Sequence, residues 1–187
     1  MRRITITWSI VAALALVPAT AQADKPTKED KTNASKQCKG LRDGMGVEAF
    51  RQLYGNKAGK NAHGKCVSKF ARDEMRERKA AKRNAAKDCK AEREADAEAF
   101  KATYGTGKAG KNAYGKCVSM KAKENKEAAD EADEEQDEIR INSAKECRAE
   151  QKADSTAFGE TYGTGRNAFG KCVSQKSREK NDEEETA

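Results

Sequence analysis

Histidine and tryptophan are almost absent from this sequence. The 187 residues include one of each, His63 and Trp8, and aromatic residues make up 5% of the chain. Zinc and haem sites draw on histidine or on closely spaced cysteines, and no C-x2-C pair is present. Such metal sites are therefore poorly supported. A histidine-based catalytic centre is equally weak, because His63 has no counterpart elsewhere in the chain.

Large apolar side chains are also scarce beyond the N-terminal region, whereas charged residues make up 37% of the chain. Burial of so little apolar surface does not compensate for the conformational entropy that the chain would lose in forming one globular core. Several small units, each held by a covalent cross-link, fit this composition better. The formal charge of +7 is a modest basic excess and does not by itself imply a nucleic-acid partner.

Residues 1–23 have the pattern of a secretory signal peptide. Arg2 and Arg3 precede an apolar run, and small residues lead to an expected cleavage after Ala23. No later segment is apolar enough to cross a bilayer. We therefore expect a protein that is secreted or held in the periplasm or cell envelope. Residues 24–32 are expected to be a disordered N-terminal segment.

The remainder consists of three copies of one unit. Each copy reads N-x2-K-x-C, a charged stretch, A-F-x3-Y-G, a polar loop, and then N-A-aromatic-G-K-C-V-S. Such self-similarity predicts a repeat architecture. The chain divides into repeat 1 (33–68), a helical connector (69–83), repeat 2 (84–119), an acidic helical connector (120–141), repeat 3 (142–174) and an acidic tail (175–187).

The six cysteines occupy equivalent positions in the three repeats. An even number of cysteines behind a signal peptide predicts a disulfide framework. The repeats favour closure of each copy on itself, and free thiols or metal ligands are the alternatives. The expected pairs are Cys38 with Cys66, Cys89 with Cys117, and Cys147 with Cys172.

The two connectors are rich in Ala, Lys, Glu and Arg and contain no Pro or Gly, which favours helix. Their lengths differ by seven residues, about two helical turns, so the insertion keeps the flanking cysteines on the same relative faces. The competing interpretation is that Asn84 and Asn142 are N-caps that begin new helices.

Disulfide geometry constrains each repeat. A plain antiparallel helix pair would leave its two cysteines about 18 Å apart along the axis, whereas a disulfide tolerates about 7 Å between Cα atoms. The first arm must therefore fold back, and helix breakers or N-cap residues lie where it would bend. They are Asp43, Gly44 and Gly46 in repeat 1, Asp96 in repeat 2 and Asp154 in repeat 3. The fold class that follows is all-α: three disulfide-stapled helical repeats joined by long charged helices, with little or no β-structure.

A small core is expected in each repeat, built on i,i+4 aromatic pairs and a third aromatic position. The same residues could instead form a ligand platform, although they are nearly all the large apolar residues available. The pairs are Phe50/Tyr54, Phe100/Tyr104 and Phe158/Tyr162; the third position holds His63, Tyr114 or Phe169; Val67, Val118 or Val173 completes each set.

The stretch Tyr104–Cys117 resembles a phosphate-binding loop, G-x4-G-K-[ST], but carries Asn112 in place of Ser or Thr. The segment before it is helical in character, and the equivalent loops differ in length. A surface turn is therefore the better interpretation. Glycine would stop one helix (Gly55, Gly105, Gly163) and asparagine would cap the next (Asn61, Asn112, Asn167).

Basic residues gather in the loops and in the first connector, whereas the second connector is acidic. Such charge runs usually mark a solvated face. The alternatives are that basic and acidic segments meet between molecules, or that the loops bind a polyanion multivalently. The candidate anion-binding residues are Lys57, Lys60, Lys65, Lys108, Lys111, Lys116, Arg166 and Lys171.

The units A-F-x3-Y-G and N-A-[HYF]-G-K-C-V-S resemble repeats in uncharacterised exported bacterial proteins, over nearly all of the chain that follows the signal peptide. The resemblance implies an exported bacterial context and no particular activity.

The sequence thus predicts a non-enzymatic structural or binding scaffold without a cofactor. Its candidate partners are another copy of the chain or an anionic envelope polymer bound by the basic loops. An extracellular enzyme is the weakest hypothesis, because this chain can hardly build the sheltered pocket that acid–base chemistry needs.

Overall fold

The computed structural model describes residues 25–56, 58–107, 109–165 and 167–185, so the expected signal peptide lies outside the described residues. Among the described residues there is no strand, only an isolated bridge between Thr106 and Lys111. The expected all-α class is confirmed. The helices are α1 (Lys28–Met45), α2 (Val47–Tyr54), α3 (Ala62–Ala95), α4 (Ala97–Tyr104), α5 (Ala113–Ala153), α6 (Ser155–Tyr162) and α7 (Ala168–Glu185).

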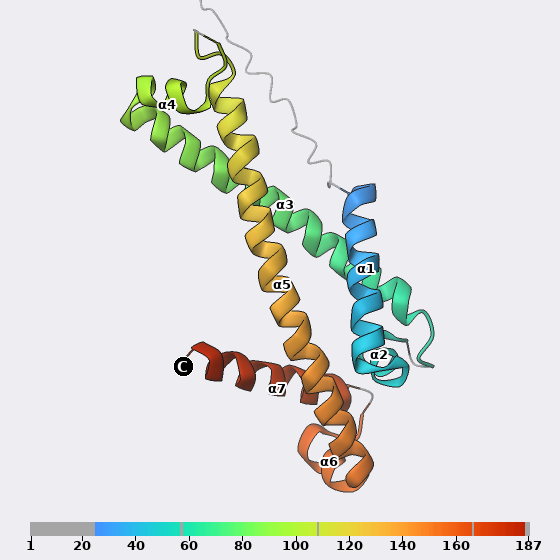
Figure 1. The fold of residues 1–187 in the computed structure, drawn as a ribbon. Helices are drawn as coiled ribbons and strands as arrows, with labels where there is room; N and C mark the ends of the chain where they lie inside the picture. The colour runs from blue at the N-terminus through green and yellow to red at the C-terminus, as the bar shows by residue number, and fades with distance from the viewer. Residues whose placement is uncertain (1–24, 57, 108, 166, 186–187) are drawn as a thin grey trace, which may run out of the picture.

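The two long helices α3 and α5 cross and form the frame of the molecule (Figure 1). They approach closely at Ala81 and Ala85, which are buried, and the Asn125 amide donates to the Ala81 carbonyl at 3.4 Å. α1 packs against α3 and α5. α4 lies at one end of α5, and α6 and α7 lie at the other (Figure 1).

The three predicted disulfides are present, each with a Cα–Cα distance of 6.0 Å. Each one ties the first helix of a repeat to its last helix, and a short helix folds back between them. Asp96 and Asp154 cap these short helices, and each side chain accepts hydrogen bonds from two backbone N–H groups. In repeat 1 this position is Gly46, which adopts φ of +85°, a conformation that favours glycine.

The alternative in which Asn84 and Asn142 begin new helices is wrong. Both residues lie inside continuous helices, Asn84 in α3 and Asn142 in α5. Each is flanked by strong helix formers, and the cysteine five residues further on is fully buried in the same helix. Propensity and packing therefore outweigh the capping preference of asparagine.

The expectation of disorder over residues 24–32 is wrong for residues 28–32, which form the start of α1. Thr27 and Asp30 make a capping box: the Thr27 hydroxyl accepts from the Asp30 N–H, and the Asp30 carboxylate accepts from the Thr27 N–H. Asp30 is 3% exposed and also binds Arg78 of α3, which fastens this first turn to the frame.

The expected loop roles of glycine and asparagine are partly wrong. Gly55 does not take a left-handed conformation, yet a Cβ there would lie 2.3 Å from the Arg51 carbonyl oxygen and 2.7 Å from Gly59 Cα. Close approach of the chain therefore requires this glycine. Asn61 and Asn112 stand at N-cap positions but are left-handed, with φ of 56° and 61°, and their side chains cap nothing.

The described residues build two apolar clusters rather than three. Repeats 1 and 3 share the larger one, in which Phe50 and Phe70 join Phe158 and Phe169. Repeat 2 has its own small cluster around Phe100 and its disulfide. Repeats 1 and 3 meet because α2 packs against the start of α7, where Leu53 approaches Gly170.

The third aromatic position is part of the core in repeat 3 alone. Phe169 is 3% exposed, whereas Tyr114 is 38% exposed and His63 is also exposed. The residue types agree with this difference in exposure, because the two exposed rings have polar partners. The Tyr114 hydroxyl donates to the Ala86 carbonyl at 3.1 Å, and His63 lies beside the Ser35 hydroxyl. The prediction of equivalent cores in all three repeats is wrong at this position.

Candidate functional site: the charged faces of the long helices

The described candidate anion-binding residues are all exposed on the surface: Lys60, Lys65, Lys111, Lys116 and Lys171. Lys57, Lys108 and Arg166 lie outside the described residues. The loops of repeats 1 and 3 adjoin a shared cavity of about 340 Å³, lined by Asn56 and Gly59 on one side and Gly165 on the other. The loop of repeat 2 lies at the far end of α5 (Figure 1).

The loop that resembles a phosphate-binding site is a closed turn. It follows helix α4 rather than a strand. Its backbone N–H groups are used internally: Lys111 donates to the Thr106 carbonyl at 3.2 Å, and Gly110 donates to the Gly107 carbonyl at 3.1 Å. A phosphate-binding loop points these groups at its ligand, so this geometry does not form that site.

A serine and the histidine adjoin on the surface between α1 and α3. Ser35 Oγ and His63 Nε2 are 3.5 Å apart. Activation of a serine requires a base within about 3.2 Å whose ring is oriented by a third group. This contact is longer than that and lies exposed on the surface, so it lacks the sheltered geometry that nucleophilic catalysis uses.

The contact between α3 and α5 contains ion pairs in which each helix contributes its minority charge. Lys121 and Lys126 point from the acidic helix α5 toward α3. Lys121 Nζ lies 2.7 Å from a Glu92 carboxylate oxygen. Lys126 Nζ lies 3.0 Å from Glu74, which is itself buried.

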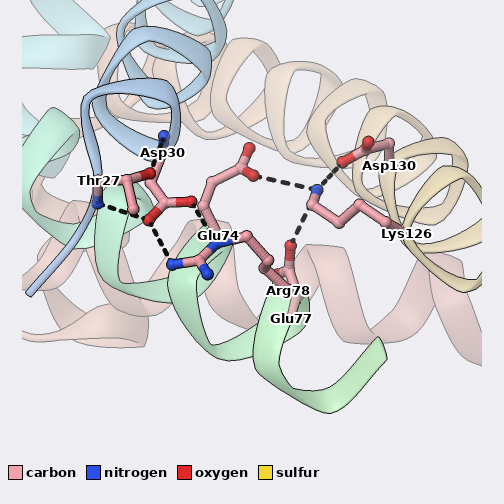
Figure 2. Close-up of polar contacts among 7 residues, drawn as sticks. All are labelled: Thr27, Asp30, Glu74, Glu77, Arg78, Lys126 and Asp130. Atoms are coloured by element: carbon pink, nitrogen blue, oxygen red, sulfur yellow. Dashed lines mark hydrogen bonds and ion pairs between the residues drawn. The ribbon is translucent and has the colours of Figure 1, made fainter. Parts of the chain in front are cut away.

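Lys126 occupies the centre of an acidic cluster (Figure 2). Its ammonium contacts Asp130 as well as Glu74, and it lies 3.7 Å from Glu77. Burial alone would lower the pKa of Lys126, but the hydrogen bonds to Asp130 and Glu74 outweigh it and hold that pKa above its usual value. Burial, followed by repulsion from Asp133, raises the pKa of Glu77.

The three carboxylates of this cluster, Glu74, Glu77 and Asp130, are close enough to share a metal ion, and no other group among the described residues is. The Lys126 ammonium forms ion pairs with all three and offsets part of their negative charge. The cluster is therefore a structural junction. A second ion pair extends it: the Arg78 guanidinium binds both oxygens of Asp30 at 3.1 and 3.2 Å and joins α1 to α3 (Figure 2).

Removing the Lys126 charge should destabilise the fold through this cluster. We expect Lys126→Met to lower the free energy of unfolding by about 2 kcal/mol at pH 7, less than for a fully buried pair because Lys126 is 20% exposed. Chemical denaturation followed by circular dichroism measures this loss. Lys123→Met on the same helix removes an exposed lysine and should cost at most about 0.5 kcal/mol.

The pH dependence of that loss has a definite sign. Burial and repulsion from Asp133 already raise the folded-state pKa of Glu77, and removal of Lys126 takes away the attraction that opposes this rise. Protonation then favours the folded state, so the deficit should shrink as the pH falls from 7 toward 4.5. A deficit that grows on acidification would contradict this role of Lys126.

With these minority charges turned inward, the outward faces of the frame each carry mostly one sign. The outer face of α5 is acidic and that of α3 is basic, with exposed Arg72, Arg76, Lys82 and Arg83. We define the acidic stripe as five exposed residues of α5: Glu124, Glu127, Glu131, Glu135 and Glu138.

α1 carries a second basic surface that the sequence interpretation missed. We define the basic stripe as Lys28, Lys31, Lys39 and Arg42, which line one side of a groove of about 500 Å³ together with His63. The sequence signal for this surface was the spacing of the four basic residues, which places them on one face of a helix. It was missed because residues 24–32 were expected to be disordered, which removed Lys28 and Lys31 from the helix.

Comparison of this chain with family models, with curated proteins and with solved structures gave no match. None of the described helices combines the length and the apolar character needed to cross a membrane.

Proposed function

We propose that this protein is a non-enzymatic binding scaffold that works outside the cytoplasm. Three disulfides in one small chain suggest an oxidising, extracytoplasmic environment. Export by the signal peptide of residues 1–23 is part of this proposal, as is placement in the periplasm, in the cell envelope or beyond.

The observation that carries the proposal is the sorting of charge on the frame. Lys121 and Lys126 of α5 face two glutamates of α3, and most of the majority charges of both helices face solvent. The inward ion pairs join the two helices, and the outward faces keep an excess of charge of one sign on each helix. A rigid frame with separate acidic and basic faces suits the binding of charged macromolecules.

Retention on two resins tests this scaffold function. A protein with this net positive charge and evenly mixed charges binds a cation exchanger alone at neutral pH. A charge-sorted scaffold is expected to bind a cation exchanger and an anion exchanger, both at low ionic strength. Passage through the anion exchanger without delay would contradict the proposal. Reversal of the acidic stripe is the matched variant and should abolish anion-exchanger binding alone.

A second candidate function is multivalent binding of an anionic polymer by the basic loops. It is favoured by the exposure of the five described lysines and by the adjoining loops of repeats 1 and 3. Two of these lysines, Lys60 and Lys111, lie in loops, and the other three lie in the first turns of α3, α5 and α7. Substitution of the five lysines by Gln should bring elution from immobilised heparin below about 0.15 M salt. The control replaces five exposed basic residues of α3 by Gln: Arg72, Lys82, Arg83, Lys87 and Lys90. Equal elution of the two variants would count against the loops.

A further inference from the structure

The basic stripe of α1 and the acidic stripe of α5 match in length and spacing. The basic side chains stand at positions 28, 31, 39 and 42, and the acidic ones at 124, 127, 131, 135 and 138. Both sets span fourteen positions along a helix, or about 21 Å, and each falls on one face of its helix. The offsets 0, 3, 11 and 14 are common to both stripes.

Each stripe is only partly neutralised by its own helix. On α1 the carboxylate of Asp30 is turned inward to Arg78, and Asp43 pairs with Arg42 at the far end. On α5 the inward turn of Lys121 and Lys126 removes two of the cations that could offset the acidic stripe. Lys123, which lies 3.5 Å from Glu127, is an exposed lysine at the edge of this stripe.

We propose that the occupant of each stripe is a second copy of this chain, with the basic stripe of one copy lying along the acidic stripe of another. The inference rests on the scaffold function proposed above and names the scaffold's partner. Charge complementarity over two straight helical faces of equal length supports it. An anionic polymer would use the basic stripe and leave the acidic stripe unused, whereas a second copy uses both.

The contact is heterologous, since two different surfaces meet. It can close as a pair with two such contacts or continue as an open chain of copies. Both arrangements depend on exposed charges, so association should weaken as ionic strength rises and the Debye length falls from about 10 Å at 0.1 M toward 3 Å at 1 M.

Sedimentation velocity of the oxidised chain, without residues 1–23, provides the first measurement. At about 0.05 M salt we expect species heavier than the monomer, in a proportion that grows with protein concentration. At about 0.5 M salt we expect the monomer. A chain that remains monomeric at low salt up to about 0.1 mM would overturn the proposal.

Charge reversal of each stripe provides the second measurement. One variant carries Lys28→Glu, Lys31→Glu, Lys39→Glu and Arg42→Glu; the other carries Glu127→Lys, Glu131→Lys, Glu135→Lys and Glu138→Lys. Each variant alone carries mostly the same sign on both stripes and should associate at least about tenfold more weakly. Mixed together, the two variants should form a complex, because the stripes of one then match those of the other.

A third variant controls for net charge. Arg72→Glu, Lys82→Glu, Arg83→Glu and Lys87→Glu on α3 change the net charge as much as the basic-stripe reversal does, and should leave self-association unchanged. Circular dichroism checks that each variant is folded. Where a reversal variant unfolds, substitution of the same residues by Gln repeats the test without repulsion.

The outcomes separate the inference from the scaffold function. Association that survives both reversals, or a mixture that does not form a complex, overturns the proposed contact. If the basic-stripe reversal abolishes heparin binding in a chain that never self-associates, the stripe is a polyanion site instead. In either case, binding of the protein to both exchange resins would still support the scaffold function. Only failure to bind the anion exchanger would contradict that function.

Discussion

Removal of the Cys89–Cys117 disulfide should unfold repeat 2 and leave the rest of the molecule folded. The bond closes a sequence separation of 28 residues, which contributes about 3–4 kcal/mol on the chain-entropy model. The apolar cluster of repeat 2 is small and includes both cysteines, so it cannot replace that contribution. In Cys89→Ala/Cys117→Ala we therefore expect rapid tryptic cleavage after Lys101, with little change in the main thermal transition.

The matched control is the equivalent bond of repeat 3. Cys147 and Cys172 lie in the cluster shared by repeats 1 and 3. Cys147→Ala/Cys172→Ala should therefore lower the main transition itself, by about 3 kcal/mol in free energy of unfolding. Equal effects of the two double variants on the main transition would contradict the division into a shared core and a separate repeat 2.

Phe169→Ala should cost about 3–4 kcal/mol in the free energy of unfolding. Phe169 is 3% exposed in the shared core, and truncation leaves a cavity between the start of α7 and the surrounding helices. Urea denaturation followed by circular dichroism measures the loss.

The chain supplies its own controls at the equivalent position of the other repeats. Tyr114→Ala removes a half-exposed ring and one hydrogen bond to Ala86, at a cost of about 1 kcal/mol. His63→Ala removes an exposed side chain and should stay within about 0.5 kcal/mol. Similar costs at all three positions would mean that the repeats are packed alike, against the shared core.

Local chemistry explains what the sequence predicted well. Disulfide pairing followed from the equivalence of the cysteines, and the short helices followed from the geometric need to fold back and from the capping residues Asp96 and Asp154. These features depend on nearby residues and on fixed bond geometry. The continuity of α3 through Asn84 was harder to predict, because a good capping residue was outweighed by helix propensity on both sides.

The shared core depends on contacts between residues far apart in the chain, which no local pattern encodes. One trace of it is present in the sequence: Leu53 of repeat 1 corresponds to Thr103 and Thr161 in the other repeats. Leu53 is the apolar residue that meets the start of α7. The second such difference is Phe169, which is apolar where the other repeats carry His and Tyr.

The sequence predicted that charged surfaces form the candidate site, but not which residues make up those surfaces. The charge runs of the connectors indicated oppositely charged segments, whereas inward pairing of the minority charges became visible only in the contact between α3 and α5. Composition records how many lysines and glutamates a helix has. It does not record which of them, such as Lys126 or Glu74, turn inward, since that depends on the crossing geometry.

Hydrogen exchange of the unmodified, oxidised protein tests the division of the fold most directly. Amides of α2, α6 and the first turns of α7 are predicted to share one opening free energy, that of global unfolding, because they lie on one core. Amides of α4 are predicted to exchange through a separate opening of lower free energy. A single opening free energy common to α2, α4 and α6 would contradict the account.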